Sequence, residues 1–424
     1  MWLTPFKVEK LFSYLVFFTG FFGVALFAID LGFFTLFAYR ILLVLLWGLV
    51  IIRALTEGKL VFPQEKIRLF IQFFVVWIIY AIISLAWAES KIDGVRNIIF
   101  LFLGVSVILF AIYYFKDKRD LNKLYWMWFG AFWILVLLGF WEHLTGQHLS
   151  VSRLYSERLV FFWHRPTGVF YNPNDYATFL AISIPFMLVA CRYVRNIATK
   201  IIGVLGMIAA FYLIVITGSR ANTLAVIIEL VFVLFFLTNL SEKLKAVFTS
   251  IICLIIALPF LPVNLFSMIV SAELSSLTAR TEVQAGSIAI RSNLARNCLE
   301  FLYPTAGLGV GSGNVEYWME NFARHNTAGI LNAHNWWLEI LTNYGILIFI
   351  CYIAVYLWLI IRLWRSWCRT NVPKERMITE ALLLSLVGFS VASISSSSIM
   401  AFEPNWMLFA FALAFLNHRH TIDQ

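Results

Sequence analysis

Charged residues are scarce in this chain, because Lys, Arg, Asp and Glu together make up 13% of its 424 residues. Soluble domains carry about twice that share, so a soluble cytosolic enzyme is excluded. None of the five cysteines lies in a Cys-x-x-Cys pair, and the spacing supports neither a disulfide framework nor a zinc site. No P-loop is present, and the acidic residues of the polar connections stand singly. Clustered carboxylates for a divalent metal are therefore not expected.

Hydrophobic residues, in contrast, make up 61% of the chain, and the mean hydropathy is +0.84. They fall into runs of roughly 20 residues, the length of a helix that crosses a bilayer. We therefore predict an all-α polytopic membrane protein with a single transmembrane domain over residues 1–424. The first run lacks a small-residue cleavage site and is interpreted as a retained helix. Twelve spans are predicted, at residues 11–29, 31–52, 69–87, 97–115, 124–141, 176–191, 199–217, 221–240, 246–270, 336–361, 378–399 and 402–417.

Basic residues are divided unevenly between the two sides of this predicted bundle. One set of alternate connections carries 21 of the 32 Lys and Arg residues, the other carries 10, and Arg40 lies within the second span. Because positive residues accumulate in cytoplasmic loops, both termini are predicted to be cytoplasmic. The net charge of +9 is scattered and forms no single patch. It therefore indicates a protein embedded in a lipid bilayer and not a nucleic-acid-binding protein.

Two long connections, residues 142–175 and 271–335, are then extracytoplasmic, and their aromatic residues indicate that they pack on the bundle. Function is expected there, because long loops in compact proteins are usually functional or disordered. They contain seven arginines and no lysine. A guanidinium group grips phosphate or carboxylate with two parallel hydrogen bonds, which favours an anionic ligand. The alternative is that topology bias alone depletes lysine there.

Arg220 is the clearest single candidate for an anion contact. It lies in the polar break at residues 217–222, where the next helix begins and offers free N–H groups. The alternative is an interfacial arginine that reaches lipid headgroups.

A second motif, Asn-Ala-His-Asn-Trp-Trp-Leu-Glu at residues 332–339, places His334 where a loop enters a predicted helix. Histidine changes charge near neutral pH, which suits it to removing a proton from a sugar hydroxyl. The alternative is a helix cap or a headgroup contact. His325 is the nearest competitor for this role, and Asp30, in the first outer connection, is a reserve base.

Two polar turns complete the set of motifs. Residues 304–314 are rich in glycine, but the context of a nucleotide-binding unit is missing. A tight turn with N–H groups available to an anion is expected there. Residues 170–176 form the second turn, in which Asn174 or Asp175 is expected either to cap the next helix or to bind sugar.

Taken together, these segments resemble the O-antigen ligase family of bacterial membrane proteins, which also includes O-antigen and capsule polymerases. The resemblance extends over about 60% of the chain, at its C-terminal side, whereas the first five spans match in hydropathy only. It is carried by YNPNDYATF at 171–179, TGSRANTL at 217–224, Arg291-x-x-Leu294 with PTAGLGVGSGN at 304–314, and AHNWWLEILTNYGILI at 333–348.

The resemblance implies a metal-independent, inverting glycosyltransferase of the bacterial inner (cytoplasmic) membrane that needs no cofactor. Its donor would be a glycan on undecaprenyl diphosphate, and its acceptor a hydroxyl of a lipid or glycan on the extracytoplasmic face. His334 matches the general base of the family, and Arg220 and Arg291 match arginines that hold the diphosphate. Five further residues are supporting candidates, namely Arg165, Arg296, Asn335, Asn174 and His325.

Ligation to a terminal acceptor and polymerisation of lipid-linked repeat units both remain open, with a slight preference for ligation. A transporter or flippase of an anionic lipid-linked glycan is the alternative from another class. It would need polar groups along a path through the midplane, whereas the polar residues here gather on the outer side. A non-enzymatic scaffold would leave the arginine-only loops unexplained.

Overall fold

The computed structural model describes residues 5–57, 67–156, 164–239, 241, 243, 287–397 and 399–422, so the predicted span 246–270 lies outside the described residues. In the described residues, the regular secondary structure is helical apart from one antiparallel hairpin of β1 (Ile29–Asp30) and β2 (Thr35–Leu36). The helices are α1 (Pro5–Thr19), η1 (Gly23–Ala25), α2 (Ala38–Glu57), α3 (Arg68–Ser84), α4 (Lys91–Tyr114), α5 (Lys118–Thr145), α6 (Arg153–Ser156), α7 (Pro173–Tyr193), α8 (Ile197–Thr217), α9 (Arg220–Phe232), η2 (Val233–Leu237), α12 (Ser287–Glu300), α13 (Val315–Phe322), α14 (Trp336–Arg369), α15 (Pro373–Ala392) and α16 (Glu403–Ile422).

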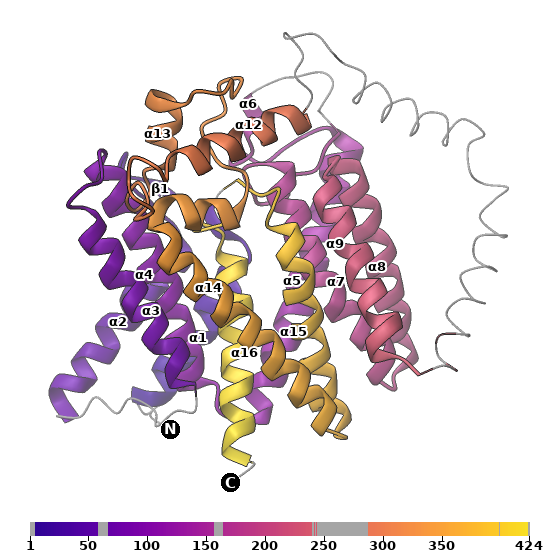
Figure 1. Cartoon of the computed structure of the whole chain (residues 1–424). Helices are drawn as coiled ribbons and strands as arrows, with labels where there is room; N and C mark the ends of the chain where they lie inside the picture. Colours follow the sequence, from indigo (N-terminus) through magenta and orange to yellow (C-terminus); the bar gives the residue numbers. More distant parts are fainter. Residues whose placement is uncertain are drawn as a thin grey trace, which may run out of the picture.

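The long helices form one bundle, and both ends of the chain lie at the same end of it (Figure 1). Among the described residues, seven segments are long and apolar enough to cross a membrane: α2, α4, α5, α7, α8, α14 and the run Arg220–Leu237. The chain is therefore an all-α, multi-pass membrane protein, while the number of twelve spans stays a prediction. The short helices α6, α12 and α13 lie opposite the termini, at the end that we call the loop end (Figure 1).

The first two predicted spans, residues 11–29 and 31–52, have the wrong bounds. α1 ends earlier and α2 begins later, and the hairpin lies between them. Asp30 accepts a hydrogen bond from the N–H of Gly32 at 2.9 Å, and Gly32 has a φ of 76°. These turn-forming residues interrupt the helix although the run is apolar, because hydropathy predicts burial in lipid and not the backbone conformation.

α7 is the most buried of the helices that could span the membrane. In its most apolar stretch, 78% of the residues are buried inside the bundle. Trp128 of α5 stacks on Phe186 of α7, with ring centroids 4.6 Å apart, and donates through Nε1 to Ser183 Oγ at 2.8 Å. Tyr125 donates to the carbonyl of Phe186 at 2.6 Å. This central position fixes the N-terminal end of α7 within the loop end, where its polar residues meet those of other helices.

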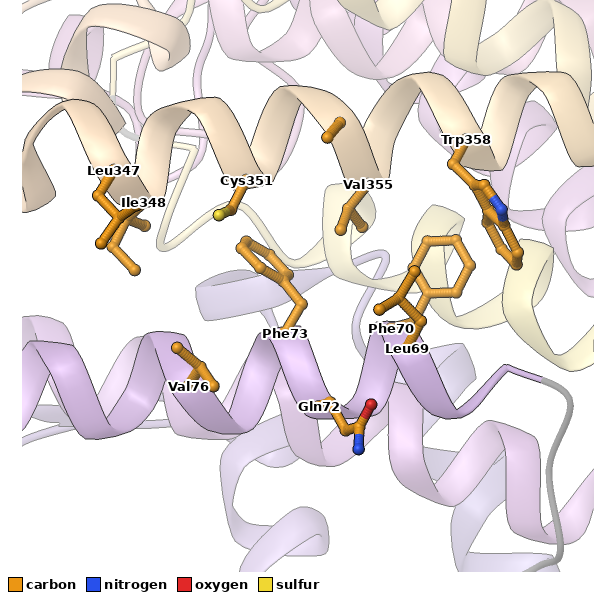
Figure 2. A pocket seen from close by; sticks show the side chains of 11 residues that line it. Leu69, Phe70, Gln72, Phe73, Val76, Leu347, Ile348, Cys351, Val355 and Trp358 are labelled. Atoms are coloured by element: carbon orange, nitrogen blue, oxygen red, sulfur yellow. The ribbon is translucent and has the colours of Figure 1, made fainter.

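α3 and α14 face each other across an apolar groove of about 500 Å³ (Figure 2). Phe73 of α3 lies opposite Cys351 of α14 in this view. The rings of Phe70 and Trp358 approach to 4.3 Å towards one end. Leu347 is 68% exposed, so the groove opens at the surface of the bundle.

α14 is broken at Gly345, whose φ of 77° and ψ of 179° are not helical. The glycine-rich turn fills this break: Val310 and Gly311 donate their N–H groups to the carbonyls of Thr342 and Asn343, at 2.8 and 3.1 Å. In return, Ile346 donates to a carbonyl of the turn. The expectation that the turn offers its N–H groups to an anion is therefore wrong for these two amides, because they replace helical hydrogen bonds.

Gly345 should be the least replaceable residue of this joint. A Cβ on Gly345 would overlap the carbonyl oxygen of Gly307, and its backbone conformation suits only glycine. We expect Gly345→Ala to destabilise the fold by roughly 2 to 3 kcal/mol, seen as a lower melting temperature of the detergent-solubilised protein. Gly130→Ala is the matched control, because no atom lies within 4 Å of a Cβ there. Equal melting temperatures for both variants would contradict this account of the kink.

Candidate functional site

Three helices bring buried polar side chains together at the loop end. Asn222 of α9 donates through Nδ2 to Ser395 Oγ at 3.0 Å and to Ser219 Oγ at 2.8 Å. Its Oδ1 accepts from the hydroxyl of Thr178 of α7 at 3.2 Å. Thr178 also bonds to Ser396, with 2.8 Å between the two hydroxyl oxygens. Because each buried group satisfies another, the ends of α7, α9 and α15 have a fixed relative position.

The N-terminus of α7 is capped by Asn172, whose Oδ1 accepts from the N–H groups of Asn174 and Asp175 at 2.9 and 3.0 Å. The prediction that Asn174 or Asp175 is the cap is therefore wrong. Pro173 takes the first helical position, where proline is favoured, and this moves the cap to the preceding residue. Asp175 accepts instead from the N–H and hydroxyl of Ser397, at 3.0 and 2.7 Å. It joins the segment after α15 to α7.

His334 lies at the edge of this network, just before α14. Its φ of 46° is in the left-handed region, and its N–H donates to Asn332 Oδ1 at 2.8 Å. The ring interacts with the backbone of Ser395 and Ser396. Its Nδ1 atom is buried and has no hydrogen-bond partner among the described residues. A non-glycine residue in this conformation is uncommon, and such strained residues concentrate at functional sites.

Burial, and then the positive charges of Arg291 and Arg153, lower the pKa of His334 to about 4, although hydrogen bonds to the backbone of Ser396 and Ser395 act in the opposite direction. The ordinary value is 6.5. The imidazole is therefore neutral at physiological pH and carries a lone pair that can accept a proton.

Four arginines from separate segments converge beside this imidazole. Arg291 of α12 and Arg153 of α6 act on His334 directly. Burial, and then the charge of Arg220, lower the pKa of Arg291. Burial and Arg153 lower the pKa of Arg165. Like charges held together repel one another, so this arrangement favours the binding of an anion between them.

Arg165 also lies against the turn that precedes Arg220. Its Nη1 atom is 3.2 Å from the position that a Cβ on Gly218 would occupy, and Gly218 has a φ of 75°. Glycine is needed here both for the turn and for the approach of the guanidinium. The supporting candidate Arg165 therefore lies near the start of α9, where Arg220 is the first residue.

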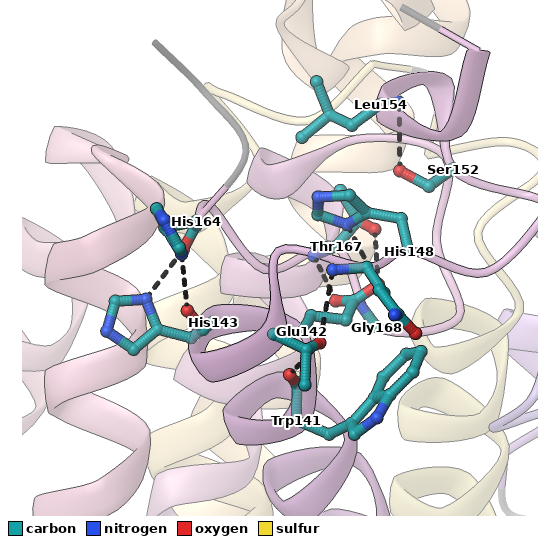
Figure 3. Close-up of polar contacts among 11 residues, drawn as sticks. Trp141, Glu142, His143, His148, Ser152, Leu154, His164, Thr167 and Gly168 are labelled. Atoms are coloured by element: carbon teal, nitrogen blue, oxygen red, sulfur yellow. Dashed lines mark hydrogen bonds and ion pairs between the residues drawn. The ribbon is translucent and has the colours of Figure 1, made fainter. Parts of the chain in front are cut away.

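The loop that carries Arg165 is anchored on Glu142, at the end of α5 (Figure 3). The carboxylate of Glu142 accepts from the N–H groups of Thr167 and Gly168, at 2.7 and 2.6 Å, and from the hydroxyl of Thr167 at 3.1 Å. His148 Nδ1 lies 3.2 Å from the same carboxylate. Glu142 is fully buried. Charge-assisted hydrogen bonds of this kind are about twice as strong as neutral ones, so the loop is firmly held.

A pair of histidines anchors the loop on the other side of Arg165 (Figure 3). His143 and His164 bond reciprocally, because Nδ1 of each ring lies 2.8 Å from the carbonyl oxygen of the other residue. Tyr212 of α8 holds the second nitrogen of His143 at 3.0 Å. Arg165 is therefore positioned by contacts both before and after it in the chain.

Two further candidates have structural roles. Asn335 caps α14, since its Oδ1 accepts from the N–H groups of Trp337 and Leu338 at 3.0 and 3.3 Å. His325 lies 2.9 Å from Glu300 Oε1 and thereby ties the segment after α13 to α12. His325 therefore contacts Glu300, whereas a base for the reaction would lie beside the arginines.

Among the described residues, no contact places Arg296 or Asp30 beside His334. Arg296 is exposed, and it follows Arg291 by five residues on α12, which turns it to another face of the helix. Asp30 is exposed on the hairpin, and its carboxylate bonds within that hairpin to Gly32.

The sequence analysis missed Arg153 as a site residue and missed the serines that follow α15. Both had a signal: Arg153 belongs to the arginine-only loops, and residues 395–398 are four consecutive serines at the end of the predicted span 378–399. That span ends earlier than predicted, because α15 stops at Ala392. Within the described part of the chain, no three His, Cys, Asp or Glu side chains are grouped to hold a metal ion.

A family model and a known relative agree on the kind of protein to which these residues belong. A family model described as O-antigen ligase matches residues 205–353, which include Arg220, Arg291 and His334. The teichuronic acid biosynthesis protein TuaE of Bacillus subtilis (strain 168) is 33% identical over 418 residues, with 96% of this chain and 85% of the relative covered. A chain in a solved peptidoglycan synthase complex is 14% identical, with a TM-score of 0.44 and coverage of 85% of this chain and 99% of that chain.

The arginine cluster should bind inorganic diphosphate. A ligand that binds only the folded state raises stability by RT ln(1 + [L]/Kd), about 2.7 kcal/mol at 100 times Kd. We expect diphosphate to raise the melting temperature of the wild type and to have a smaller effect on Arg291→Gln. Arg296→Gln is the matched control, because it removes the same charge from an exposed position of the same helix. Identical shifts in wild type and Arg291→Gln would exclude Arg291 from the anion site.

Proposed function

Because the chain belongs to the O-antigen ligase family, we propose that it transfers a glycan from undecaprenyl diphosphate to an acceptor hydroxyl. Family membership and the relative TuaE support a role in the biosynthesis of a cell-envelope polysaccharide. The observation that carries the proposed reaction is a neutral, half-buried His334 that interacts with arginines from other segments. A proton acceptor next to a polycationic site is what transfer from a diphosphate-linked sugar requires.

The donor already contains its leaving group. In the proposed step, the acceptor oxygen forms a bond to the anomeric carbon while the bond from that carbon to the diphosphate oxygen breaks. The diphosphate leaves with the bonding electron pair, and Arg220, Arg291 and Arg165 neutralise the charge that develops on it. Arginine suits this task, since its planar fork makes two parallel hydrogen bonds to phosphate oxygens.

His334 takes the proton that the acceptor hydroxyl loses. In the empty site burial and Arg291 keep the pKa of His334 at about 4, so the ring is free of a proton. A bound diphosphate adds negative charge next to the ring and opposes the effect of the arginines. The pKa of His334 therefore rises when the donor binds, which makes the ring a stronger base when it is needed.

The fold also supports a substrate that carries a polyprenyl chain. The groove between α3 and α14 is lined almost entirely by apolar side chains, and Leu347 and Val76 at its walls are more than half exposed (Figure 2). An isoprenoid chain suits such a surface by van der Waals packing, because lipid tails are as apolar as the groove and the hydrophobic effect gives no preference within a bilayer.

We place the loop end on the extracytoplasmic face of the bacterial cytoplasmic membrane and both termini in the cytoplasm. The basic-residue count supports this orientation, and both ends of the chain lie opposite the loop end in Figure 1. The same residues serve ligation to a terminal acceptor and polymerisation onto another lipid-linked unit, because the two reactions differ only in what carries the hydroxyl.

Replacing His334 should separate catalysis from donor binding. His334→Asn is the suitable variant, because asparagine tolerates the left-handed backbone that this position requires. We expect transfer to fall about 100-fold or more while binding of undecaprenyl diphosphate is nearly unchanged. His325→Asn, outside the arginine cluster, should keep its activity. Full transfer by His334→Asn in single-turnover assays would overturn the assignment of the base.

The pH dependence of transfer should show the lowered pKa of His334. A protonated ring cannot accept the acceptor proton, so kcat/KM for the donor should stay level from pH 7 down to about pH 5 and fall near pH 4. Arg291→Gln removes a positive charge and should move this acid limb to higher pH, whereas Arg296→Gln should not. An acid limb at pH 6.5 in both wild type and Arg291→Gln would show that His334 is not the titrating base.

A further inference from the structure

A polar cavity of about 190 Å³ lies next to His334. Asn332 and Ala333 form one of its walls, while the ring of the following residue, His334, interacts with Arg291 and Ser396 instead. The other walls come from α4, from the start of α13 and from the first half of α14. His334 and the four arginines that act on it or on one another are absent from the described lining of the cavity, so the cavity adjoins the arginine cluster and is distinct from it.

Two buried asparagines line this cavity with unused hydrogen-bond donors. Asn343, 2% exposed, accepts through Oδ1 from the N–H groups of Asn314 and Val315, at 2.9 and 3.1 Å, which fixes the orientation of its amide. Asn97, 9% exposed, accepts through Oδ1 from Ser312 at 3.2 Å and from the hydroxyl of Tyr344.

Neither Nδ2 group donates to any partner within the described ranges of the chain. Neither Nδ2 atom is among the buried side-chain atoms that lack a partner, so both are accessible from the cavity, where a ligand can accept from them. Two such donors in the wall of one cavity indicate a ligand that supplies oxygen acceptors.

The charge of the cavity is opposite to that of the arginine cluster. Its described lining contains three carboxylates, Asp93, Glu316 and Glu339, and one cation, Arg96, which pairs with Asp93 at 3.1 Å. A diphosphate would be repelled by this excess of negative charge. Hydroxyl groups, in contrast, donate to carboxylates and accept from the amides, so the lining suits a neutral or amino sugar.

We propose that this cavity binds the terminal sugar of the acceptor and presents its hydroxyl to His334, a proposal that rests on the proposed function. The space of about 190 Å³ corresponds to about six water molecules at roughly 30 Å³ each, and one sugar ring displaces about that number. In a direct displacement, the attacking oxygen and the leaving diphosphate lie on opposite sides of the anomeric carbon. This reaction needs two neighbouring subsites next to one base: Asn332 and Ala333 line the cavity, and the arginines act on the ring of the next residue, His334.

The test uses the full-length protein with Asn343→Asp and Asn97→Asp. Each change keeps the shape and the accepting oxygen but replaces the NH₂ donor by a negatively charged oxygen. The acceptor probe is the repeat-unit oligosaccharide released by mild acid from the lipid-linked intermediate of the host. We expect KM for this acceptor to rise at least 10-fold, while undecaprenyl diphosphate binds each variant as it binds the wild type. Asn321→Asp is the matched control, because Asn321 is exposed on α13 and outside the cavity.

Melting temperatures show whether the variants fold, and Glu316→Gln, at an exposed edge of the cavity, gives a second measurement that does not depend on buried positions. An unchanged acceptor KM in both asparagine variants would overturn the proposal, and so would a rise in donor KM alone, which would assign the cavity to the donor sugar. Saturation-transfer NMR of the oligosaccharide separates the two hypotheses. Suppose that the wild type binds the oligosaccharide but transfers no glycan, and that Asn343→Asp abolishes this binding. The proposed function would then be wrong, while the cavity would remain a sugar site.

Discussion

The site depends on one constraint: the polar groups at the loop end are buried inside a membrane protein and must satisfy one another. Asn222 is fully buried and bonds to α7, to the turn before α9 and to the segment after α15. Away from water an unsatisfied amide costs several kcal/mol, so few arrangements of these three helix ends are stable. The ring of His334 contacts Ser395 and Ser396, and Arg220 directly follows Ser219. The network thus positions both His334 and Arg220.

The arginine cluster and the polar cavity differ in charge, so they suit different ligands. In the cluster, arginines from α6, α9 and α12 and the loop after α5 create a positive potential that suits a diphosphate. In the cavity, carboxylates and amides create a lining that suits hydroxyl groups. Burial and arginine charge act in the same direction on the pKa of His334, so the ring that we propose as the base would stay unprotonated until an anion binds. This coupling would tie proton removal to the presence of the donor.

The sequence predicted much of this arrangement, because its motifs stand next to apolar runs. Arg220, Arg291 and His334 could be assigned to one side of the bundle by counting spans, and the structure does bring them together. Arg153 and Ser396 could not be found in this way, since their part depends on how a loop and a helix end fold back. The helix cap at Asn172 instead of Asn174 is a detail of local geometry. It depends on the single residue Pro173, and a hydropathy pattern does not distinguish such residues. Arg296 was named as a supporting candidate beside Arg291, because the helix that turns it to another face was not expected there.

The kink in α14 connects the two halves of the site. The first half of α14 follows His334 directly, carries Glu339 and Asn343 on the wall of the cavity, and ends at Gly345. The glycine-rich turn holds this half by hydrogen bonds to Thr342 and Asn343. The four arginines of the cluster lie on other elements and do not line the cavity, while α12, which carries Arg291, packs on this half of α14 through the bond from the Thr342 hydroxyl to the carbonyl of Cys298. Acceptor specificity in such a fold can therefore change through the cavity lining without loss of the donor site, which is why residues such as Asn97 and Asn343 are the positions at which to look for it.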